Sequence, residues 1–139
     1  MLNDEIGIRI RAAVPADALA WELLRNELWP DGAGEHSAEI SSFFAGTLDE
    51  PVAVLMAETG AGTSVGIAEL SIRTDISEFE GQRAGYVEGL YVVPEMRWRG
   101  VARLLMRASR DWAREQKCTG FASDRAGRIV IDRSFSAGY

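Results

Sequence analysis

The chain has almost none of the residues that cross-link small proteins or bind metals in them. Its 139 residues include one cysteine, Cys118, and one histidine, His36. One cysteine cannot form an internal disulfide, and a conventional Cys/His zinc site needs more ligands than these two. A chain of this length can bury enough apolar surface to fold without such links. We therefore expect one domain over residues 1–139, a reducing cytoplasmic setting and no metal.

Long apolar runs are also missing. No segment approaches the roughly 20 apolar residues that a membrane-spanning helix needs. The first five residues include two acids and lack the basic-then-apolar plan of a secretory signal. We therefore expect a cytoplasmic protein with no membrane partner.

Basic residues are absent from one long stretch of the chain. Residues 26–72 contain no Lys or Arg but eight acids, whereas residues 97–133 contain ten basic residues against four acids. The first stretch is suited to bind cations and the second to bind phosphates. Because the net charge is −6, a general nucleic-acid partner is not expected. An unevenly charged, solvated surface would explain the same asymmetry.

The apolar pattern predicts a mixed sheet with helices on its faces, which is an α/β (α+β) fold. The predicted order is β-α-α-β-β-β-α-β-α, and residues 74–83 are expected to form a polar loop. The predicted strands cover residues 6–11, 51–58, 65–73, 85–93 and 121–123. The predicted helices cover residues 15–29, 35–45, 101–117 and 129–137.

The most informative segment joins the fourth predicted strand to the third predicted helix. Its sequence is Arg97-Trp98-Arg99-Gly100-Val101-Ala102. The first N–H groups of a helix have no intrahelical partner, and the helix dipole favours negative charge there. Gly100 and Ala102 add no bulk, so a diphosphate could approach the main chain. The spacing is that of neither a P-loop nor a dinucleotide fingerprint, and a solvated basic loop is the alternative.

In its context, after two helices and three strands, this segment resembles the acetyl-CoA motif of the GNAT superfamily of N-acetyltransferases. The resemblance implies the GNAT fold, acetyl-CoA as co-substrate and no metal. Main-chain groups near Leu90, Tyr91 and Val92 would bind the pantetheine arm, and a strand N–H near Leu90 or Val92 would polarise the thioester carbonyl. The pyrophosphate would lie on the turn Trp98-Arg99-Gly100-Val101-Ala102-Arg103.

Four further segments resemble one group of this superfamily, the aminoglycoside 6′-N-acetyltransferases. They are Glu27-Leu28-Trp29-Pro30, Leu70-Ser71-Ile72-Arg73-x-Asp75, Glu88-Gly89 with Val92, and Ala122-Ser123-Asp124. The resemblance implies direct transfer of acetyl from acetyl-CoA to the 6′-amine of an aminoglycoside in a ternary complex, and hence antibiotic resistance. It also implies a homodimer.

The resemblance assigns roles to particular residues, and the chemistry agrees because aminoglycosides are polycations. Glu88, a catalytic residue, would hold the reacting amine and accept its proton through water. Asp124, assigned to both catalysis and binding, would anchor a second amine. Trp29 would form a wall for the sugar, while Glu69 and Asp31 would add negative field.

Each of these residues also has a purely structural interpretation. Trp29 could be a core aromatic residue and Asp124 a turn or cap residue. Cys118 is expected to pack as a small hydrophobic residue. Tyr86 and Tyr91 are expected to serve in the packing of their strand. His36 is expected at the surface of an acidic helix.

The chain departs from the group in three places. Ile76 stands where the group has a substrate-contacting Tyr. The loop Arg125-Ala126-Gly127-Arg128 lacks the group's coenzyme-contacting Asn. Residues 136–139 resemble the end of the last helix, after which GNAT domains continue with two more strands, so we expect a truncated domain with an exposed sheet edge. These departures leave two alternatives: an acetyltransferase for a polyamine, amino acid or protein N-terminus, and a non-catalytic acetyl-CoA-binding remnant.

Overall fold

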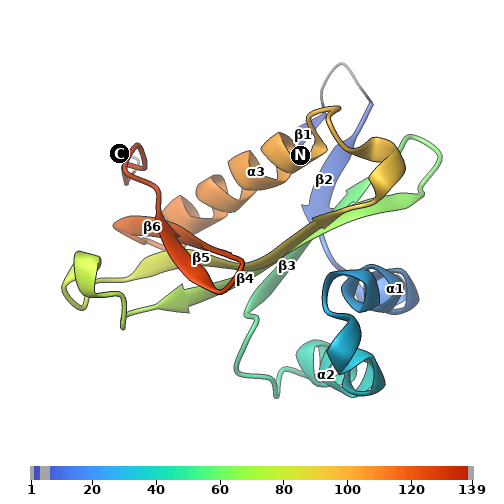
Figure 1. Ribbon diagram of the computed structural model, residues 1–139, viewed down its shortest axis with the longest axis horizontal. Coiled ribbons are helices and arrows are strands. Elements are labelled where there is room, and N and C mark those ends of the chain that lie inside the picture. The colour runs from blue at the N-terminus through green and yellow to red at the C-terminus, as the bar shows by residue number, and fades with distance from the viewer. Residues whose placement is uncertain (1, 4–6, 138–139) are drawn as a thin grey trace.

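The computed structural model describes residues 2–3 and 7–137, which form a mixed sheet of seven strands in the order β1-β2-β3-β4-β5-β6-β7 (Figure 1). Only β5 and β6 are parallel neighbours; the other pairs are antiparallel. The strands are β1 (Leu2–Asn3), β2 (Arg9–Ala12), β3 (Ala53–Glu58), β4 (Ser64–Arg73), β5 (Ala84–Val92), β6 (Gly120–Arg125) and β7 (Arg128–Ile131).

In the described part of the chain, three α-helices cover the two faces of the sheet, as Figure 1 shows. The helix α3 (Val101–Glu115) lies along one face, while α1 (Ala18–Leu28) and α2 (Ala33–Ala45) lie on the other. Four short 3-10 helices are η1 (Pro15–Asp17), η2 (Pro30–Gly32), η3 (Ser77–Phe79) and η4 (Pro94–Met96). No described helix is long and apolar enough to cross a membrane.

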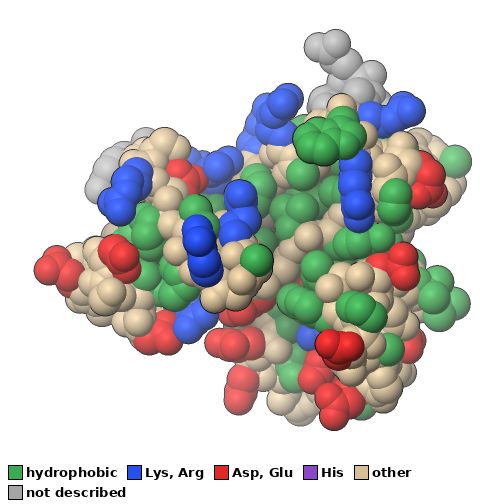
Figure 2. Space-filling view, viewed as in Figure 1, with side chains coloured by type: hydrophobic (Ala, Val, Ile, Leu, Met, Phe, Trp, Pro, Cys, Tyr) green, Lys and Arg blue, Asp and Glu red, His purple; other side chains and the backbone are tan. Residues whose placement is uncertain are grey.

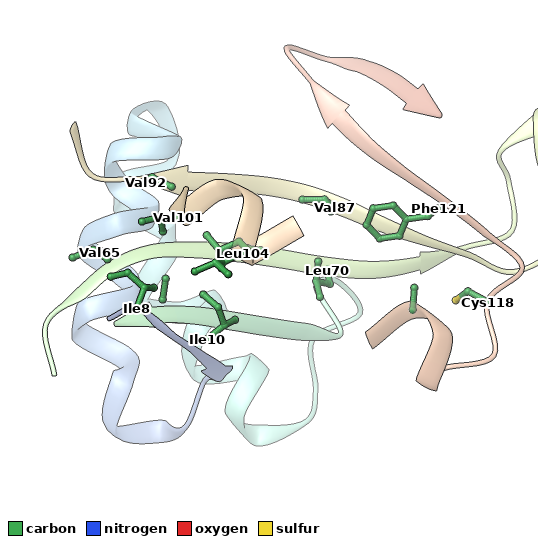
Figure 3. Close-up of a cluster of buried hydrophobic side chains, with 14 residues drawn as sticks. Ile8, Ile10, Val65, Leu70, Val87, Val92, Val101, Leu104, Cys118 and Phe121 are labelled. Carbon is green, nitrogen blue, oxygen red and sulfur yellow. The ribbon is translucent and has the colours of Figure 1, made fainter. Parts of the chain in front are cut away.

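Each face of the sheet has its own core. On the α3 face, Leu70 of β4 and Val87 of β5 are buried with Leu104 of α3 and with Phe121 of β6 (Figure 3). On the opposite face Trp21 is fully buried, and its ring meets those of Phe43 and Phe44 edge to face at 5.1 and 5.7 Å. These two cores hold β4 and β5 rigidly between the helices.

The predicted helix at residues 129–137 is wrong, because this segment begins with β7 and forms a hairpin with β6. Ala126 and Gly127 have φ values of 55° and 79°, the left-handed backbone of a tight hairpin turn. The β-branched run Ile129-Val130-Ile131 favours a strand. Within the described residues, β6 is therefore paired on both sides, with β5 and with β7. The other predicted elements lie within a few residues of their expected places; Ile6, Gly138 and Tyr139 are outside the described residues.

The one cysteine and the one histidine of the chain are both buried. Cys118 is fully buried, as expected for a packed hydrophobic residue. His36 was expected at the surface, and this was wrong: it is 4% exposed, and its Nδ1 lies 2.7 Å from Oδ1 of Asn26. The packing of α2 against α1 turns His36 inward, and burial lowers the pKa of its imidazole.

Candidate active site

A cavity of about 380 Å³ opens where α3 begins, and we call it the turn cavity. Most of the residues predicted to bind the cofactor line it, but Arg99 of the pyrophosphate turn and Leu90 and Tyr91 of the pantetheine segment do not. Met96 and Arg97 line it without having been in the predicted set. Its lining residues are Val92, Met96, Arg97, Trp98, Gly100, Val101, Ala102 and Arg103.

Backbone geometry makes the turn cavity an anion cradle. Gly100 is the N-cap of α3 with φ of 92°, a conformation that a side chain would strain. The first helical hydrogen bond runs from the N–H of Leu104 to the carbonyl of Gly100, at 3.1 Å. The N–H groups of the three residues in between have no intrahelical partner, as at every helix start. Beside them the ring of Trp98 is fully exposed.

The arginine that begins the turn is tied to the end of β5. Arg97 Nε donates to the carbonyl of Val92 at 2.8 Å, and its guanidinium lies 5.3 Å from the ring centre of Tyr91. Tyr91 in turn donates from its hydroxyl to Glu27 at 3.4 Å. Arg97 therefore fixes the turn against the strand in addition to contributing charge.

One edge of β5 is open between the turn cavity and Glu88. Parallel pairing with β6 covers Ala84 to Val87, opposite Gly120 to Ser123, and goes no further. Figure 3 shows the β6–β7 hairpin diverging from β5 beyond Phe121. Main-chain groups on this side of residues 88–92 therefore have no strand partner among the described residues, and an extended ligand could pair with them.

A second cavity, of about 200 Å³, lies at the other end of this open edge, and we call it the acidic cavity. The structure brings together Trp29, Glu69 and Glu88 as the sequence predicted, whereas Asp31 does not line it. Its other lining residues were not predicted, because none of them stands in a recognisable motif. The full lining is Arg25, Trp29, Glu50, Pro51, Glu69 and Glu88.

The close packing of Trp29 explains why a glycine follows Glu88 in β5. A Cβ atom on Gly89 would lie 2.6 Å from Cη2 of Trp29 and 2.8 Å from Cδ2 of Leu28, so only glycine fits. Trp29 is half-buried, and the guanidinium of Arg25 lies 5.3 Å from its ring centre. It is therefore a wall of the acidic cavity and not a core residue.

Glu88 occupies a β-bulge. Glu69 pairs with Gly89 and Leu70 pairs with Val87, so Glu88 has no partner on β4. Its Oε2 atom is buried without a hydrogen-bond partner among the described residues, and so is the hydroxyl of Ser71. Burial raises the pKa of the Glu88 carboxyl, and the negative charge of Glu50 adds to the effect. An unpaired carboxylate with a raised pKa can accept a proton from a ligand.

Glu69 and Arg25 form a buried pair beneath the acidic cavity. Glu69 is 1% exposed; its Oε2 accepts from Trp21 Nε1 at 2.8 Å and lies 3.0 Å from Arg25 Nε. Arg25 also pairs with Glu39. Burial raises the pKa of Glu69 although the Arg25 cation opposes the shift. The one cation of the cavity lining is thus already engaged by two carboxylates.

Asp124 lies outside the acidic cavity, at the end of β6. Its Oδ1 accepts from the Gly127 N–H at 3.0 Å, and its Oδ2 accepts from the Tyr86 hydroxyl at 3.3 Å. Burial and the nearby Asp124 charge raise the pKa of Tyr86 to about 12. Asp124 therefore has the turn role foreseen as its structural alternative, yet its charge is close enough to contribute to the raised pKa of Glu88. Ile76 is buried against Tyr86.

The molecule thus presents an anion cradle and a carboxylate-lined cavity joined by an open strand edge. Figure 2 shows Lys and Arg over the upper part of one face and Asp and Glu chiefly over the lower part. No group of three or more His, Cys, Asp or Glu side chains in the described ranges is arranged to hold a metal ion. The arrangement suits a reaction between an anionic, extended donor and a cationic acceptor.

The comparisons with known proteins agree with this chemistry. The model of the acetyltransferase (GNAT) family matches residues 19–128. An aminoglycoside N(6′)-acetyltransferase type 1 from Klebsiella aerogenes is 43% identical over 116 residues, which cover 83% of this chain and 76% of the relative. One from Acinetobacter haemolyticus is 34% identical over 128 residues, covering 91% and 86%.

Solved structures give the same result. Aminoglycoside N-acetyltransferase AAC(6′)-Iy, in complex with the bisubstrate analogue CoA-S-monomethyl-acetylneamine, superposes with a TM-score of 0.76 at 30% identity. The superposition covers 86% of this chain and 80% of that one. The aminoglycoside 6′-N-acetyltransferase from Acinetobacter haemolyticus without ligand superposes with a TM-score of 0.74 at 34% identity, covering 85% and 79%.

Proposed function

The chain belongs to the acetyltransferase (GNAT) family, and on that premise we propose that it transfers an acetyl group from acetyl-CoA to the 6′-amine of aminoglycoside antibiotics, which confers resistance. One structural observation carries the proposal. An acidic cavity containing the unpaired carboxylate of Glu88 lies at one end of an open strand edge, and an anion cradle lies at the other. Relatives that carry this activity in their names match most of the chain.

The turn cavity and the open edge of β5 fit acetyl-CoA. We assign the pyrophosphate to the turn Trp98 to Arg103, where free helix N–H groups and left-handed Gly100 leave the main chain accessible. The pantetheine arm is assigned to main-chain groups of residues 90–92, which have no parallel partner. When bound, acetyl-CoA supplies the thioester carbonyl that the amine attacks. A β5 N–H near Leu90 or Val92 stabilises the negative charge that develops on that oxygen.

Glu88 prepares the amine for attack. An aminoglycoside amine is protonated at neutral pH and becomes nucleophilic only after it loses a proton. The Glu88 carboxylate holds the ammonium group and receives its proton, through water where the two do not touch. The amide C–N bond then forms as the thioester C–S bond breaks, the second proton lost by the amine goes to the sulfur, and the coenzyme leaves as its thiol without a covalent enzyme intermediate. Holding both reactants on one strand edge supplies much of the rate enhancement.

Two further residues are assigned to the substrate. Trp29 provides an apolar wall against one sugar ring, positioned by Gly89 beneath it. Asp124 attracts a second amine from outside the acidic cavity, through the carboxylate that it carries near the end of β6.

A second candidate is acetylation of another polyamine, such as spermine. One observation favours it: Ile76, which stands where the group has a substrate-contacting Tyr, is 2% exposed and cannot contact a ligand. An acidic cavity that lacks this contact would discriminate less strongly between polycations.

We further propose that the enzyme works in the cytoplasm, where acetyl-CoA is produced, and that it does so as a homodimer, as its resemblance to this group of enzymes implies. Size-exclusion chromatography with light scattering measures the molar mass in solution. We expect the mass of a dimer, and the mass of a monomer would contradict the proposal.

The decisive experiment measures thiol release from acetyl-CoA, with mass detection of the product. The acceptors are kanamycin, an aminoglycoside with a hydroxyl in place of the 6′-amine, and spermine. Turnover with kanamycin and none with the 6′-hydroxyl compound establishes the proposed reaction and its position. Faster turnover of spermine than of kanamycin would establish the second candidate instead.

A further inference from the structure

We propose that Glu50 is a second substrate-binding carboxylate, which holds an ammonium group of the aminoglycoside other than the one that is acetylated. The inference rests on the proposed function and identifies a specificity-determining residue within the same site. Glu50 lies in the loop between α2 and β3, outside every motif that points to this activity, and it reaches the acidic cavity only through the fold.

Three carboxylates line the acidic cavity, and they differ in whether other side chains already engage them. Glu69 is buried and already engaged by Trp21 and Arg25, so it cannot turn to a ligand. Within the described part of the chain, Oε2 of Glu88 is buried without a hydrogen-bond partner, and neither Glu50 nor Glu88 forms an ion pair. Glu50 is also exposed, so a ligand can reach it from solvent. These are the two carboxylates available to a cation.

The charge balance of the acidic cavity calls for a ligand with more than one positive charge. Its one lining cation, Arg25, is neutralised by Glu69 and Glu39. Glu50 and Glu88 line the same cavity, and the negative charge of Glu50 contributes to the raised pKa of Glu88. Two like charges in one cavity repel until a cation bridges or pairs with them. A substrate with two ammonium groups satisfies both, whereas a monoamine satisfies one.

The loop that carries Glu50 is fastened to the sheet. Pro51 lines the same cavity, and the N–H of Val52 donates to the carbonyl of Leu70 in β4 at 2.8 Å. Leu70 precedes Ser71, whose hydroxyl lies close enough to the Glu88 carboxyl to oppose the rise in its pKa. The Glu50 carboxylate is thus held near the reacting carboxylate by an anchored backbone, which limits the entropy lost on binding.

The test compares Glu50→Gln with Asp49→Asn, which removes the same charge from the exposed neighbouring residue outside the cavity. Two acceptors are used: kanamycin, and a 6-amino-6-deoxyglucoside, whose only amine is the reacting one. For kanamycin we expect Glu50→Gln to raise KM about tenfold, the size of one charge-assisted contact, with kcat within about twofold. For the monoamine we expect less than about a twofold change. Asp49→Asn should leave both KM values unchanged.

A pH profile supplies a readout that a merely structural role would not change. Neutralising Glu50 removes a negative charge near Glu88 and lowers the pKa of Glu88, so the acidic limb of kcat/KM should move to lower pH in Glu50→Gln. Equal losses in Glu50→Gln and Asp49→Asn, or equal losses with both acceptors, would overturn the proposal.

The outcome remains separable from that of the proposed function. If the wild-type protein does not acetylate kanamycin, the proposed reaction fails, and titration calorimetry of kanamycin then decides the role of Glu50. A dissociation constant about tenfold higher in Glu50→Gln than in Asp49→Asn supports the second carboxylate, and equal constants reject it.

Discussion

The turn cavity and the acidic cavity are built in opposite ways. The turn cavity comes almost entirely from one continuous stretch, residues 96–103, and offers main-chain N–H groups around Gly100. The acidic cavity takes side chains from α1, the residue that ends it, the α2–β3 loop, β4 and β5. A site made of backbone tolerates the loss of side chains and fails when the backbone conformation changes. A site made of side chains should show the reverse pattern, and the following substitutions test this contrast.

The largest effect is expected from removing the carboxylate of Glu88. Glu88→Gln keeps the shape of the residue but cannot accept a proton, so kcat/KM for kanamycin should fall roughly 100- to 1,000-fold. The dissociation constant of acetyl-CoA should change less than about twofold, because Glu88 lies outside the turn cavity. Steady-state kinetics and calorimetry measure the two quantities. Glu95→Gln, an exposed acid in η4, is the matched control, and a comparable loss there would contradict the assignment.

A backbone change in the turn should come next. Gly100→Ala places a Cβ on a residue with φ of 92°, at a cost of about 1–2 kcal/mol, or displaces the turn. We expect the KM for acetyl-CoA to rise about tenfold. Gly34→Ala in α2, where an added Cβ meets nothing within 4 Å and φ is ordinary, should leave KM unchanged and stabilise the fold slightly. An unchanged KM in Gly100→Ala would show that the phosphates bind elsewhere.

Asp124→Asn tests a side chain of mixed role. Asparagine keeps an oxygen to accept from the Gly127 N–H, so the hairpin turn should persist while the negative charge is lost. The KM for kanamycin should rise roughly fivefold with kcat nearly unchanged. Tyr86→Phe, which removes only the other hydrogen-bond partner of Asp124, should have a smaller effect. An unchanged KM in Asp124→Asn would reduce Asp124 to a turn residue.

Single side chains of the turn should contribute less to acetyl-CoA binding than its backbone does. Arg103→Ala leaves the backbone cradle intact and should raise the KM for acetyl-CoA only about threefold, as for a solvent-screened charge. The difference should shrink at high ionic strength, because salt screens the interaction with phosphate. A loss as large as that of Gly100→Ala would mean that the turn binds through its side chains.

The smallest expected effect is on stability. The folded-state pKa of Glu88 is raised, so its ionisation is disfavoured in the folded protein. The stability that the protonated Glu88 carboxyl gives the folded protein is fully present below the pKa of this group in the unfolded chain, about 4.3. It is lost as pH rises through the pKa in the folded protein. Glutamine does not ionise, so Glu88→Gln does not lose this stability. The unfolding free energy of the variant minus that of wild type should therefore be larger at pH 8 than at pH 4. Urea unfolding at the two pH values measures the difference, and a decrease would contradict the raised pKa.

Local patterns predicted most elements but failed where two local signals competed. Residues 129–137 were predicted as a helix from the apolar pattern, although the Ala126–Gly127 turn and the β-branched run of residues 129–131 favour the observed hairpin. His36 was misplaced because its acidic neighbours indicated a solvated helix, while packing against α1 determined which face was buried. Such errors arise because propensity is weak compared with tertiary packing.

By itself the sequence determined the GNAT fold and predicted, through its resemblance to known acetyltransferases, a phosphate-binding turn and roles for Trp29 and Glu88, because each segment that carries the resemblance is short and continuous. Only the tertiary structure decided that Glu50 joins them, that Arg25 is neutralised by Glu39 and Glu69, and that Asp124 stands apart. The β-bulge at Glu88 and the divergence of β6 from β5 were also decided only by the tertiary structure. These features depend on which strands pair, in which register, and on how two helices pack across them, and no local stretch of residues encodes those long-range contacts.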